Sequence, residues 1–411
     1  MHLIKSEKAI DMSIDIVEIV NGTKAAAQSK DKLGTLPDEL LLRLFDTLGH
    51  ISKKDLCSVS RLNKRYHRLG DAVLYKSLLL DTPELHLTFS ESLGRRPRRG
   101  SAIYEVKLAY PSTELSNLHL DAPLRKHNDP SHSLSRMTNL EKLDISLPDI
   151  LLHGIGSLFN GPFDLAYLKS CTLFYQCAND QYWDLRENIH IFTLSTLESL
   201  TIKRARLDER GFDFLERPHP TDLKKLYLID CDINDDGLSD ILEFPTALEE
   251  FVMTQADEPE PDLVESSDTF SDYMAALDYQ AHSLRSITVN SPTLSSRKVL
   301  RMRHFESLKV LRMNWDYQLF GKSTKKPRLH SVGLPPNLEL LEFFNELGTD
   351  EGVTDLLLSL VQSKKAVADR WKSIVVVESD KTVIKNLREA CMEQDLQLDV
   401  IGALDTDTDT E

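Results

Sequence analysis

The sequence predicts an α/β protein in which a small three-helix domain precedes an irregular solenoid, a stack of coils that each add one strand to a parallel sheet. Two observations lead to this class. Amphipathic segments with helix periodicity lie within residues 33–80, and a six-residue phrase with strand periodicity recurs ten times within residues 100–403. We expect segment 1–32 to be largely disordered, and the acidic tail 404–411, which offers little apolar area, to be disordered as well.

Three short amphipathic segments make up the predicted helical domain. The first begins at Pro37, a residue that suits the first turn of a helix because its missing N–H has no partner there, and Gly49 is a suitable end. The second opens at Ser52 or Asp55, and the third carries Tyr66. The apolar stripe of the first repeats every four residues, at Leu36, Leu40, Leu44 and Leu48. Three short helices hold only a small core, so we expect the domain to gain stability from a partner or from the following domain.

These segments together resemble the F-box motif. The residues that carry the resemblance are Leu36-Pro37-x-Glu39-Leu40, Leu44, Leu48, Asp55-Leu56, Val59, Arg61-x-x-x-Arg65-Tyr66 and Leu74-Tyr75. Tyr66 and Tyr75 stand where tryptophan is commoner. The resemblance implies that this domain docks on the Skp-type adaptor of SCF ubiquitin ligases and, through it, on a cullin. The contact residues implied by position are Leu36, Pro37, Leu40, Leu44 and Leu56. The alternative is an ordinary helical cap that buries the same leucines internally.

A phrase with the spacing apolar-x-x-apolar-x-apolar recurs along the rest of the chain. Its ten copies are Ile103–Leu108, Leu140–Ile145, Leu168–Leu173, Leu197–Ile202, Leu223–Leu228, Leu248–Met253, Leu284–Val289, Leu308–Met313, Leu338–Phe343 and Trp371–Val376. The last two apolar residues of each copy point to the same side of a strand. Because one unit cannot cover its apolar face, successive units must stack into a parallel sheet with helices or loops on the outer side.

The phrase resembles the leucine-rich repeat, and two copies extend over more of that pattern. These are Leu197–Leu207 and Leu223–Ile233, and in the second Cys231 takes the Asn/Cys position of the repeat. The uneven spacing of the copies predicts loops of uneven length. The chain is expected to close with a βαβ cap, formed by strands over 373–378 and 396–401 and a helix over 382–393.

Side chains between the inward positions should line the concave face of the sheet. Those expected there are Lys203, Tyr227, Ile229, Val252, Thr288, Arg312, Asn314, Glu342 and Phe344. Apolar, aromatic and arginine side chains at such positions are typical of a recognition surface. We therefore predict that a target protein contacts this face, and the predicted contacts are Lys203, Tyr227, Ile229, Arg312 and Phe344. The alternative is that flanking loops cover these residues.

Charge argues against a general nucleic-acid-binding protein, because the net charge is −16. No Lys or Arg lies between Lys225 and Arg285, whereas sixteen acidic residues do. Part of this interval, 255–271, is rich in Pro and Glu. One interpretation is a disordered, solubilising loop. The other is an acidic wall beside the concave face that attracts a basic partner protein.

No motif for catalysis or for a cofactor is found, so we predict neither. The P-loop, HExxH and GxSxG patterns are absent, and the five cysteines form no CxxC pair. The odd cysteine count favours a reducing compartment, cytoplasmic or nuclear, and no apolar run is long enough for a membrane helix. The basic clusters Arg95–Arg99 and Lys325–Arg328 are expected to be loops, with a nuclear localisation signal as the alternative.

The sequence therefore predicts a non-catalytic substrate-recognition subunit of an SCF-type E3 ubiquitin ligase. It would act by proximity, holding a target protein near the ubiquitin-loading enzyme. The alternative is a protein-interaction scaffold of the leucine-rich-repeat type without a ligase role. No membrane or nucleic-acid partner is expected.

Overall fold

The chain forms two compact units, Met1–Leu74 and Tyr75–Glu411, in the computed structural model. The structure describes residues 33–111, 130–159, 165–178, 181–207, 212, 219–255, 269–295, 300–316, 319, 333–347, 351–377 and 381–402. The predicted disordered ends, most of the Pro- and Glu-rich interval and the Lys325–Arg328 cluster lie outside these residues. Each unit is described by itself below.

The first unit consists of three helices around a small core. They are α2 (Asp38–Ile51), α3 (Lys53–Ser60) and α4 (Lys64–Leu74). The Ser52 side chain caps α3 by accepting a hydrogen bond from the Asp55 N–H, and the Asn63 side chain accepts one from the Tyr66 N–H at the start of α4. The buried core residues are Leu41, Phe45, Leu56, Tyr66 and Leu69. The three predicted helical segments are thus present.

Helices α3 and α4 approach each other closely at Gly70. A β-carbon on this residue would lie 1.9 Å from the Ser60 hydroxyl oxygen, so only glycine fits. Ser60 is itself buried, and its hydroxyl donates a hydrogen bond to the Leu56 carbonyl at 2.7 Å. This contact fixes how α4 lies across α3.

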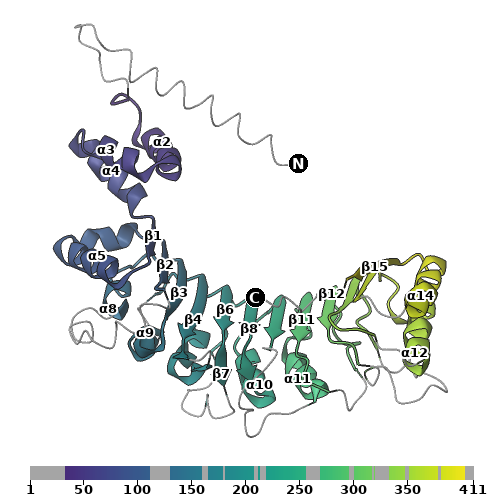
Figure 1. Cartoon of the computed structure of the whole chain (residues 1–411). Helices are drawn as coiled ribbons and strands as arrows, with labels where there is room; N and C mark the ends of the chain where they lie inside the picture. The colour runs from purple at the N-terminus through teal and green to yellow at the C-terminus, as the bar shows by residue number, and fades with distance from the viewer. Residues whose placement is uncertain are drawn as a thin grey trace, which may run out of the picture. The chain divides into compact units, whose positions relative to one another are not determined.

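The second unit is built on a twelve-stranded sheet in which every pair of neighbours is parallel (Figure 1). In spatial order the strands are β1 (Ser77–Leu80), β2 (Glu105–Ala109), β3 (Lys142–Pro148), β4 (Ser170–Gln176), β6 (Ser199–Lys203), β8 (Lys225–Ile229), β10 (Glu250–Thr254), β11 (Ser286–Asn290), β12 (Val310–Met313), β13 (Leu340–Phe343), β14 (Ser373–Val377) and β15 (Gln397–Ile401). Each of the ten predicted phrases contributes one strand, and these ten strands are consecutive neighbours. The predicted solenoid-like stacking is confirmed.

A second, three-stranded sheet runs beside part of the first. Its strands are β5 (Trp183–Asp184), β7 (Ala205–Leu207) and β9 (Asp232–Ile233). Strands β7 and β9 belong to the two phrases that extend furthest in the sequence. In each, a residue with positive φ, Arg204 or Asp230, follows the main-sheet strand and turns the chain into the second sheet.

Helices and turns pack on one face of the main sheet (Figure 1). They are α5 (Pro83–Arg95), η1 (Pro97–Ala102), α8 (Pro130–Leu134), η3 (Asp149–Leu151), α9 (Leu152–Phe159), η5 (Leu185–Thr193), α10 (Asp235–Leu242), α11 (Phe270–Ala276), η7 (Leu277–Gln280), α12 (Glu351–Gln362), α13 (Lys364–Val367) and α14 (Lys381–Glu393). One core runs through the whole unit, from Leu80 on β1 to Leu396 before β15. The predicted βαβ ending is present as β14, α14 and β15.

Two predictions about the first part of the chain need correction. The helical domain was expected to continue to residue 80, but the first unit ends at Leu74, and Ser77–Leu80 form the edge strand β1 paired with β2. The Arg95–Arg99 cluster was expected to be a loop, whereas it contains the end of α5 and the start of η1. There the Arg99 guanidinium lies 4.6 Å from the centre of the Tyr75 ring, which orders the cluster.

Candidate functional site

An apolar stripe on α2 is the first candidate binding surface. Leu40 and Leu44 are 46% and 42% exposed, although the neighbouring Leu41 and Phe45 are buried in the core. The members of this exposed stripe follow helical spacing: Pro37, Leu40, Leu44, Leu48 and Ile51. All of them are exposed except Leu48, which is half-buried. A helix that buries one apolar face and exposes a second one is suited to bind a partner protein.

Leu56 does not belong to this surface. Its exposure is 0%, and it packs in the core between the three helices, so the prediction that it contacts a partner is wrong. Leu36 is half-buried and packs against the same core, while Pro37 is exposed.

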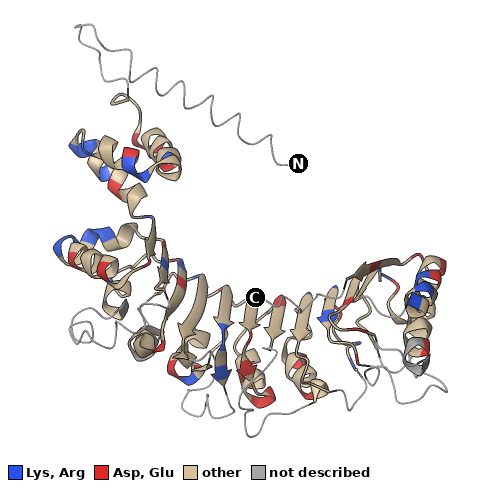
Figure 2. Cartoon of the chain, viewed as in Figure 1, with Lys and Arg blue, Asp and Glu red and all other residues tan. Residues whose placement is uncertain are grey.

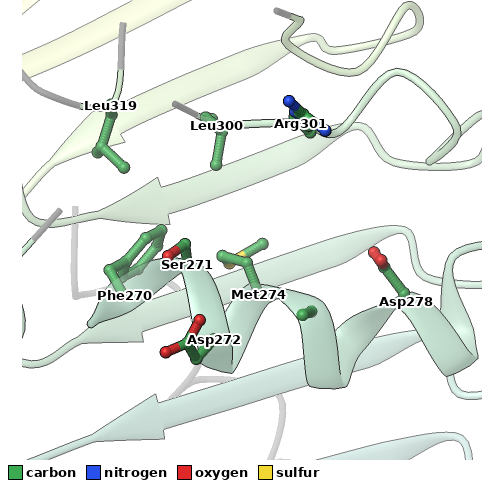
Figure 3. A pocket seen from close by; sticks show the side chains of 9 residues that line it. Phe270, Ser271, Asp272, Met274, Asp278, Leu300, Arg301 and Leu319 are labelled. Carbon is green, nitrogen blue, oxygen red and sulfur yellow. The ribbon is translucent and has the colours of Figure 1, made fainter. Parts of the chain in front are cut away.

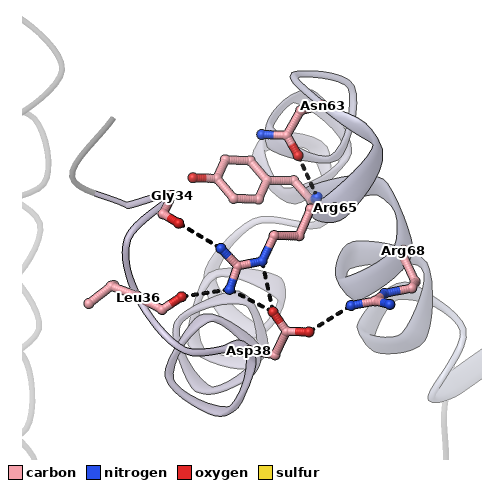
Figure 4. Close-up of polar contacts among 7 residues, drawn as sticks. Gly34, Leu36, Asp38, Asn63, Arg65 and Arg68 are labelled. Carbon is pink, nitrogen blue, oxygen red and sulfur yellow. Dashed lines mark hydrogen bonds and ion pairs between the residues drawn. The ribbon is translucent and has the colours of Figure 1, made fainter. Parts of the chain in front are cut away.

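Arg65 fixes the chain that leads into α2 (Figure 4). Its guanidinium donates hydrogen bonds to the carbonyl oxygens of Gly34 and Leu36, both at 2.6 Å, and its Nε donates to the Asp38 carboxylate at 2.8 Å. Arg68 binds the second Asp38 oxygen at 2.6 Å. This arginine clamp ties the segment before the exposed stripe to α4. Sequence analysis placed Arg65 in the motif but gave it no role.

The uncovered face of the main sheet is the second candidate surface. Along β2 to β14, alternate side chains enter the core, and those between them form what we call the open face, where they are half-buried or exposed except for the buried Thr288 on β11. Strand register places one such row of residues side by side. From β6 to β13 this row is Thr201, Tyr227, Val252, Thr288, Arg312 and Glu342.

The predicted contact residues all lie at or next to this row. Lys203 pairs in register with Ile229, and the two lie two residues beyond Thr201 on β6 and Tyr227 on β8. Phe344 directly follows β13 and is half-buried. The structure therefore brings these residues to one face, while their contact with a target stays a prediction. Further half-buried apolar residues of the same face were not predicted, among them Phe174, Val310, Leu340 and Val375. Their positions in the repeated phrase are the signal that identifies them.

The open face carries an apolar patch, flanked on the same face by Lys203 and by the Lys225–Glu250 ion pair. Tyr227 and Val252 are neighbours in register, and Ile229 lies beside them on β8. Partial burial and a hydrogen bond to Glu250 raise the pKa of Tyr227 to about 12, so its hydroxyl stays a neutral donor at physiological pH. Further along the row, Arg312 donates to the Glu342 carboxylate at 2.7 Å. An aromatic and aliphatic patch beside an anchored arginine is typical of a protein-binding surface.

A ladder of opposite charges borders this face at the start of the strands. Each of these charged residues directly precedes a strand and forms an ion pair with the charged residue before an adjacent strand. The pairs are Glu141–Lys169 at 3.3 Å, Glu198–Lys224 at 3.8 Å, Glu249–Arg285 at 3.4 Å and Lys309–Glu339 at 3.1 Å, with Lys372 also on Glu339. Hydrogen bonds from Lys372 and Lys309 lower the pKa of Glu339. This charge ladder neutralises one border of the sheet, which leaves the apolar patch as the better contact for a partner.

Of the acidic residues predicted to form a wall, those at 257–268 lie outside the described residues, so the structure bears only on the others. Helices α10 and α11 carry several of the acidic residues, and they pack on the opposite, helix-covered face of the sheet (Figure 2). Glu249 lies at the border of the open face and pairs with Arg285, and Glu250 lies on the open face and pairs with Lys225. Among the described residues of this interval, the exposed acids Asp236, Glu243 and Asp278 thus lie on or beside the outer helices.

The described residues offer surfaces for binding, and no assembled reactive group was found among them. Burial raises the pKa of Cys177 and Cys391 to about 11 and that of Cys231 to about 12, so these thiols are protonated at neutral pH. Within the described ranges, no three His, Cys, Asp or Glu side chains are grouped so as to hold a metal ion. No described helix combines the length and apolar composition that a membrane crossing requires.

The fold and the two surfaces define the class of this chain as a parallel α/β solenoid that follows a three-helix unit. None of the protein-family models matches the chain, and no curated protein has a significantly similar sequence.

Proposed function

We propose that this protein is the substrate-recognition subunit of an SCF-type ubiquitin ligase. The three-helix unit is an F-box that binds a Skp-type adaptor and, through it, a cullin. The leucine-rich-repeat array holds a target protein on its open face. The contribution of the protein to ubiquitin transfer is proximity, because holding the target raises its effective concentration at the loaded enzyme.

The exposed stripe on α2 carries this proposal. Leu40 and Leu44 expose nearly half of their surface while the unit already has a complete core of its own. An ordinary helical cap would instead bury these leucines. The segment Leu36–Pro37, which the F-box resemblance assigns to the adaptor, is held in place by the Arg65 guanidinium. A prepared segment beside an apolar stripe supports docking into a groove of a partner.

Titration with a purified Skp-type adaptor tests the proposal. We expect the intact chain to form a complex, and the Leu40→Lys/Leu44→Lys variant to bind more than about tenfold more weakly, because burial of the exposed parts of two leucines contributes roughly 1.5–3 kcal/mol. Leu85→Lys is a matched control, since Leu85 is 44% exposed but lies on α5 in the second unit.

The control should bind the adaptor like the unchanged chain, and circular dichroism should show that all variants keep their helices. A chain that forms no complex with the adaptor would contradict the ligase role and leave the interaction scaffold as the better explanation.

A further inference from the structure

Arginine side chains gather where α5 ends and η1 begins (Figure 2). Arg136, from the chain after α8, joins them. Its Nη1 approaches Gly94 on α5, and its carbonyl oxygen lies so close to Gly100 of η1 that a β-carbon there would collide with it. Glycine at position 100 therefore allows the Arg136 backbone to pack directly on η1. The members of this surface, which we call the arginine patch, are Arg95, Arg96, Arg98, Arg99 and Arg136.

Three members of the arginine patch are available to bind an anion. Arg98 is exposed and Arg136 is half-buried, and neither forms an ion pair with another described residue. Arg95 lies 3.4 Å from the Glu91 carboxylate, but both side chains are largely exposed, so water screens this pair. The two remaining members have partners within the chain. A cation in the last turn stabilises a helix, which explains Arg95 but neither of the other two.

The chemistry of the arginine patch favours carboxylates. A guanidinium binds a carboxylate through two parallel hydrogen bonds, a geometry that lysine does not offer. Nucleic acid is a poorer fit, because its affinity depends on many phosphate contacts along an extended basic surface, and this chain carries a net charge of −16. A short segment that carries several carboxylates matches a patch confined to the end of one helix and the turn that follows.

The chain itself contains such a segment. The acidic tail, residues 404–411, includes the run DTDTDTE, in which four acids alternate with threonine. Alternate side chains of an extended segment point to the same side, so that all four carboxylates can face the guanidinium groups together. The acidic tail follows β15, which is one of the two edge strands of the main sheet.

The acidic tail is too short to reach the arginine patch of its own copy. The patch lies beside β1, at the other edge of the twelve-stranded sheet (Figure 1). With neighbouring strands about 4.8 Å apart, the two edges are separated by roughly 50 Å along the sheet. The stretch from residue 403 to residue 411 spans at most about 30 Å when fully extended. A contact between the two therefore requires a second copy.

A groove of about 470 Å³ beside α11 is nearer to the acidic tail in strand order, but its charges do not suit an acidic segment. Asp272 and Asp278 line this groove together with Arg301, around an apolar floor that includes Phe270 and Met274 (Figure 3). Two carboxylates beside a single guanidinium do not attract further negative charge. Within the described residues, the arginine patch is the better match.

We propose that the acidic tail of one copy binds the arginine patch of a second copy. Its carboxylates pair with Arg98 and Arg136 and compete with Glu91 for Arg95. Because the two surfaces in this contact differ, each copy offers one tail and one patch, and the association is head-to-tail. The contact involves neither the exposed stripe on α2 nor the open face, and it does not depend on the ligase role.

Fluorescence anisotropy with a labelled peptide of residues 403–411 tests the contact. We expect the full-length protein to bind this peptide, more weakly as the NaCl concentration rises, and not to bind a peptide in which Asn and Gln replace the four acids. Arg95→Glu/Arg98→Glu should weaken binding at least about tenfold, because two attractions become repulsions. Sedimentation equilibrium should show self-association of the full-length protein, and both this variant and removal of residues 405–411 should abolish it.

Lys385→Glu/Arg388→Glu is the matched control, because it makes the same charge change at two exposed positions of α14. It should bind the peptide like the unchanged chain, and circular dichroism should show that both double variants keep their helices. The proposal is overturned if the peptide does not bind, if the neutral peptide binds equally well, or if the two double variants bind alike. It is also overturned if the protein stays monomeric above the peptide Kd, or if a DNA duplex binds more tightly than the peptide.

Discussion

Arg65 shows how one side chain prepares a binding surface. Three of its hydrogen bonds hold the chain before α2, through the carbonyls of Gly34 and Leu36 and the Asp38 carboxylate. We expect Arg65→Ala to weaken adaptor binding about 30-fold or more, because the freed Leu36–Pro37 segment must then be ordered on binding at about 1–2 kcal/mol per residue. Isothermal titration measures the affinity, and hydrogen exchange over residues 34–37 should become faster.

Arg65→Lys is an informative comparison, since lysine keeps the charge but cannot form the same fork of hydrogen bonds. The affinity of Arg65→Lys for the adaptor should lie between that of the unchanged chain and that of Arg65→Ala. Unchanged affinity in Arg65→Ala, despite faster exchange, would show that the clamp serves only the stability of the helical unit.

At the residue scale, the sequence correctly predicted the spacing of the apolar residues on the helices, but not in every case whether a side chain points into the core or to the surface. Periodicity predicted one apolar stripe on α2, at Leu36, Leu40, Leu44 and Leu48, but it could not decide whether Leu40 or Leu41 faces outward. That choice depends on where α3 and α4 cross α2. Leu56 was assigned to the surface through the F-box resemblance, although the crossing helices bury it completely.

Single buried side chains also join one element of the solenoid to the next, and Gln280 is the clearest example. Its amide nitrogen donates to the carbonyls of Leu242 and Pro245 at 2.9 and 2.7 Å, and its amide oxygen accepts from the Leu248 N–H at 3.0 Å. We expect Gln280→Leu to lower the free energy of unfolding by at least about 2 kcal/mol, because three buried backbone groups lose their partner.

Urea unfolding followed by tryptophan fluorescence measures this loss, since all three tryptophans lie in the second unit. Gln397→Leu is the control. Gln397 is exposed on β15 and its amide bonds only to Asp399 among the described residues, so the change should stay within about 0.5 kcal/mol. Equal effects of the two substitutions would contradict the role of Gln280.

At the scale of elements, repetition made the strands predictable. All ten phrases became strands because each one needs neighbours to cover its apolar face. Strand β1 was missed because the segment Ser77–Leu80 lacks the phrase and borders the helical unit. Helix α5 was missed because its sequence adjoins the arginine cluster. Helices on the outer side were expected, but the acids of α10 and α11 were assigned in one interpretation to a wall beside the concave face, since charge along a sequence does not show on which side of a sheet a side chain lies.

At the scale of the whole molecule, the account assigns separate tasks to the two units. In the proposed function the exposed stripe would contact the adaptor and the open face would contact the target, while the charge ladder keeps one border of the sheet neutral. Removal of the first unit should therefore abolish one set of partners and preserve the other. The cut belongs at Tyr75, because a deletion to residue 80 would remove edge strand β1 and expose β2.

Affinity capture with mass spectrometry, on the intact chain and on a chain that begins at Tyr75, tests this division most directly. The account predicts that the Skp-type adaptor and the cullin accompany only the intact chain, whereas the target protein accompanies both. Adaptor captured by the shortened chain, or no adaptor captured by the intact chain, would contradict it.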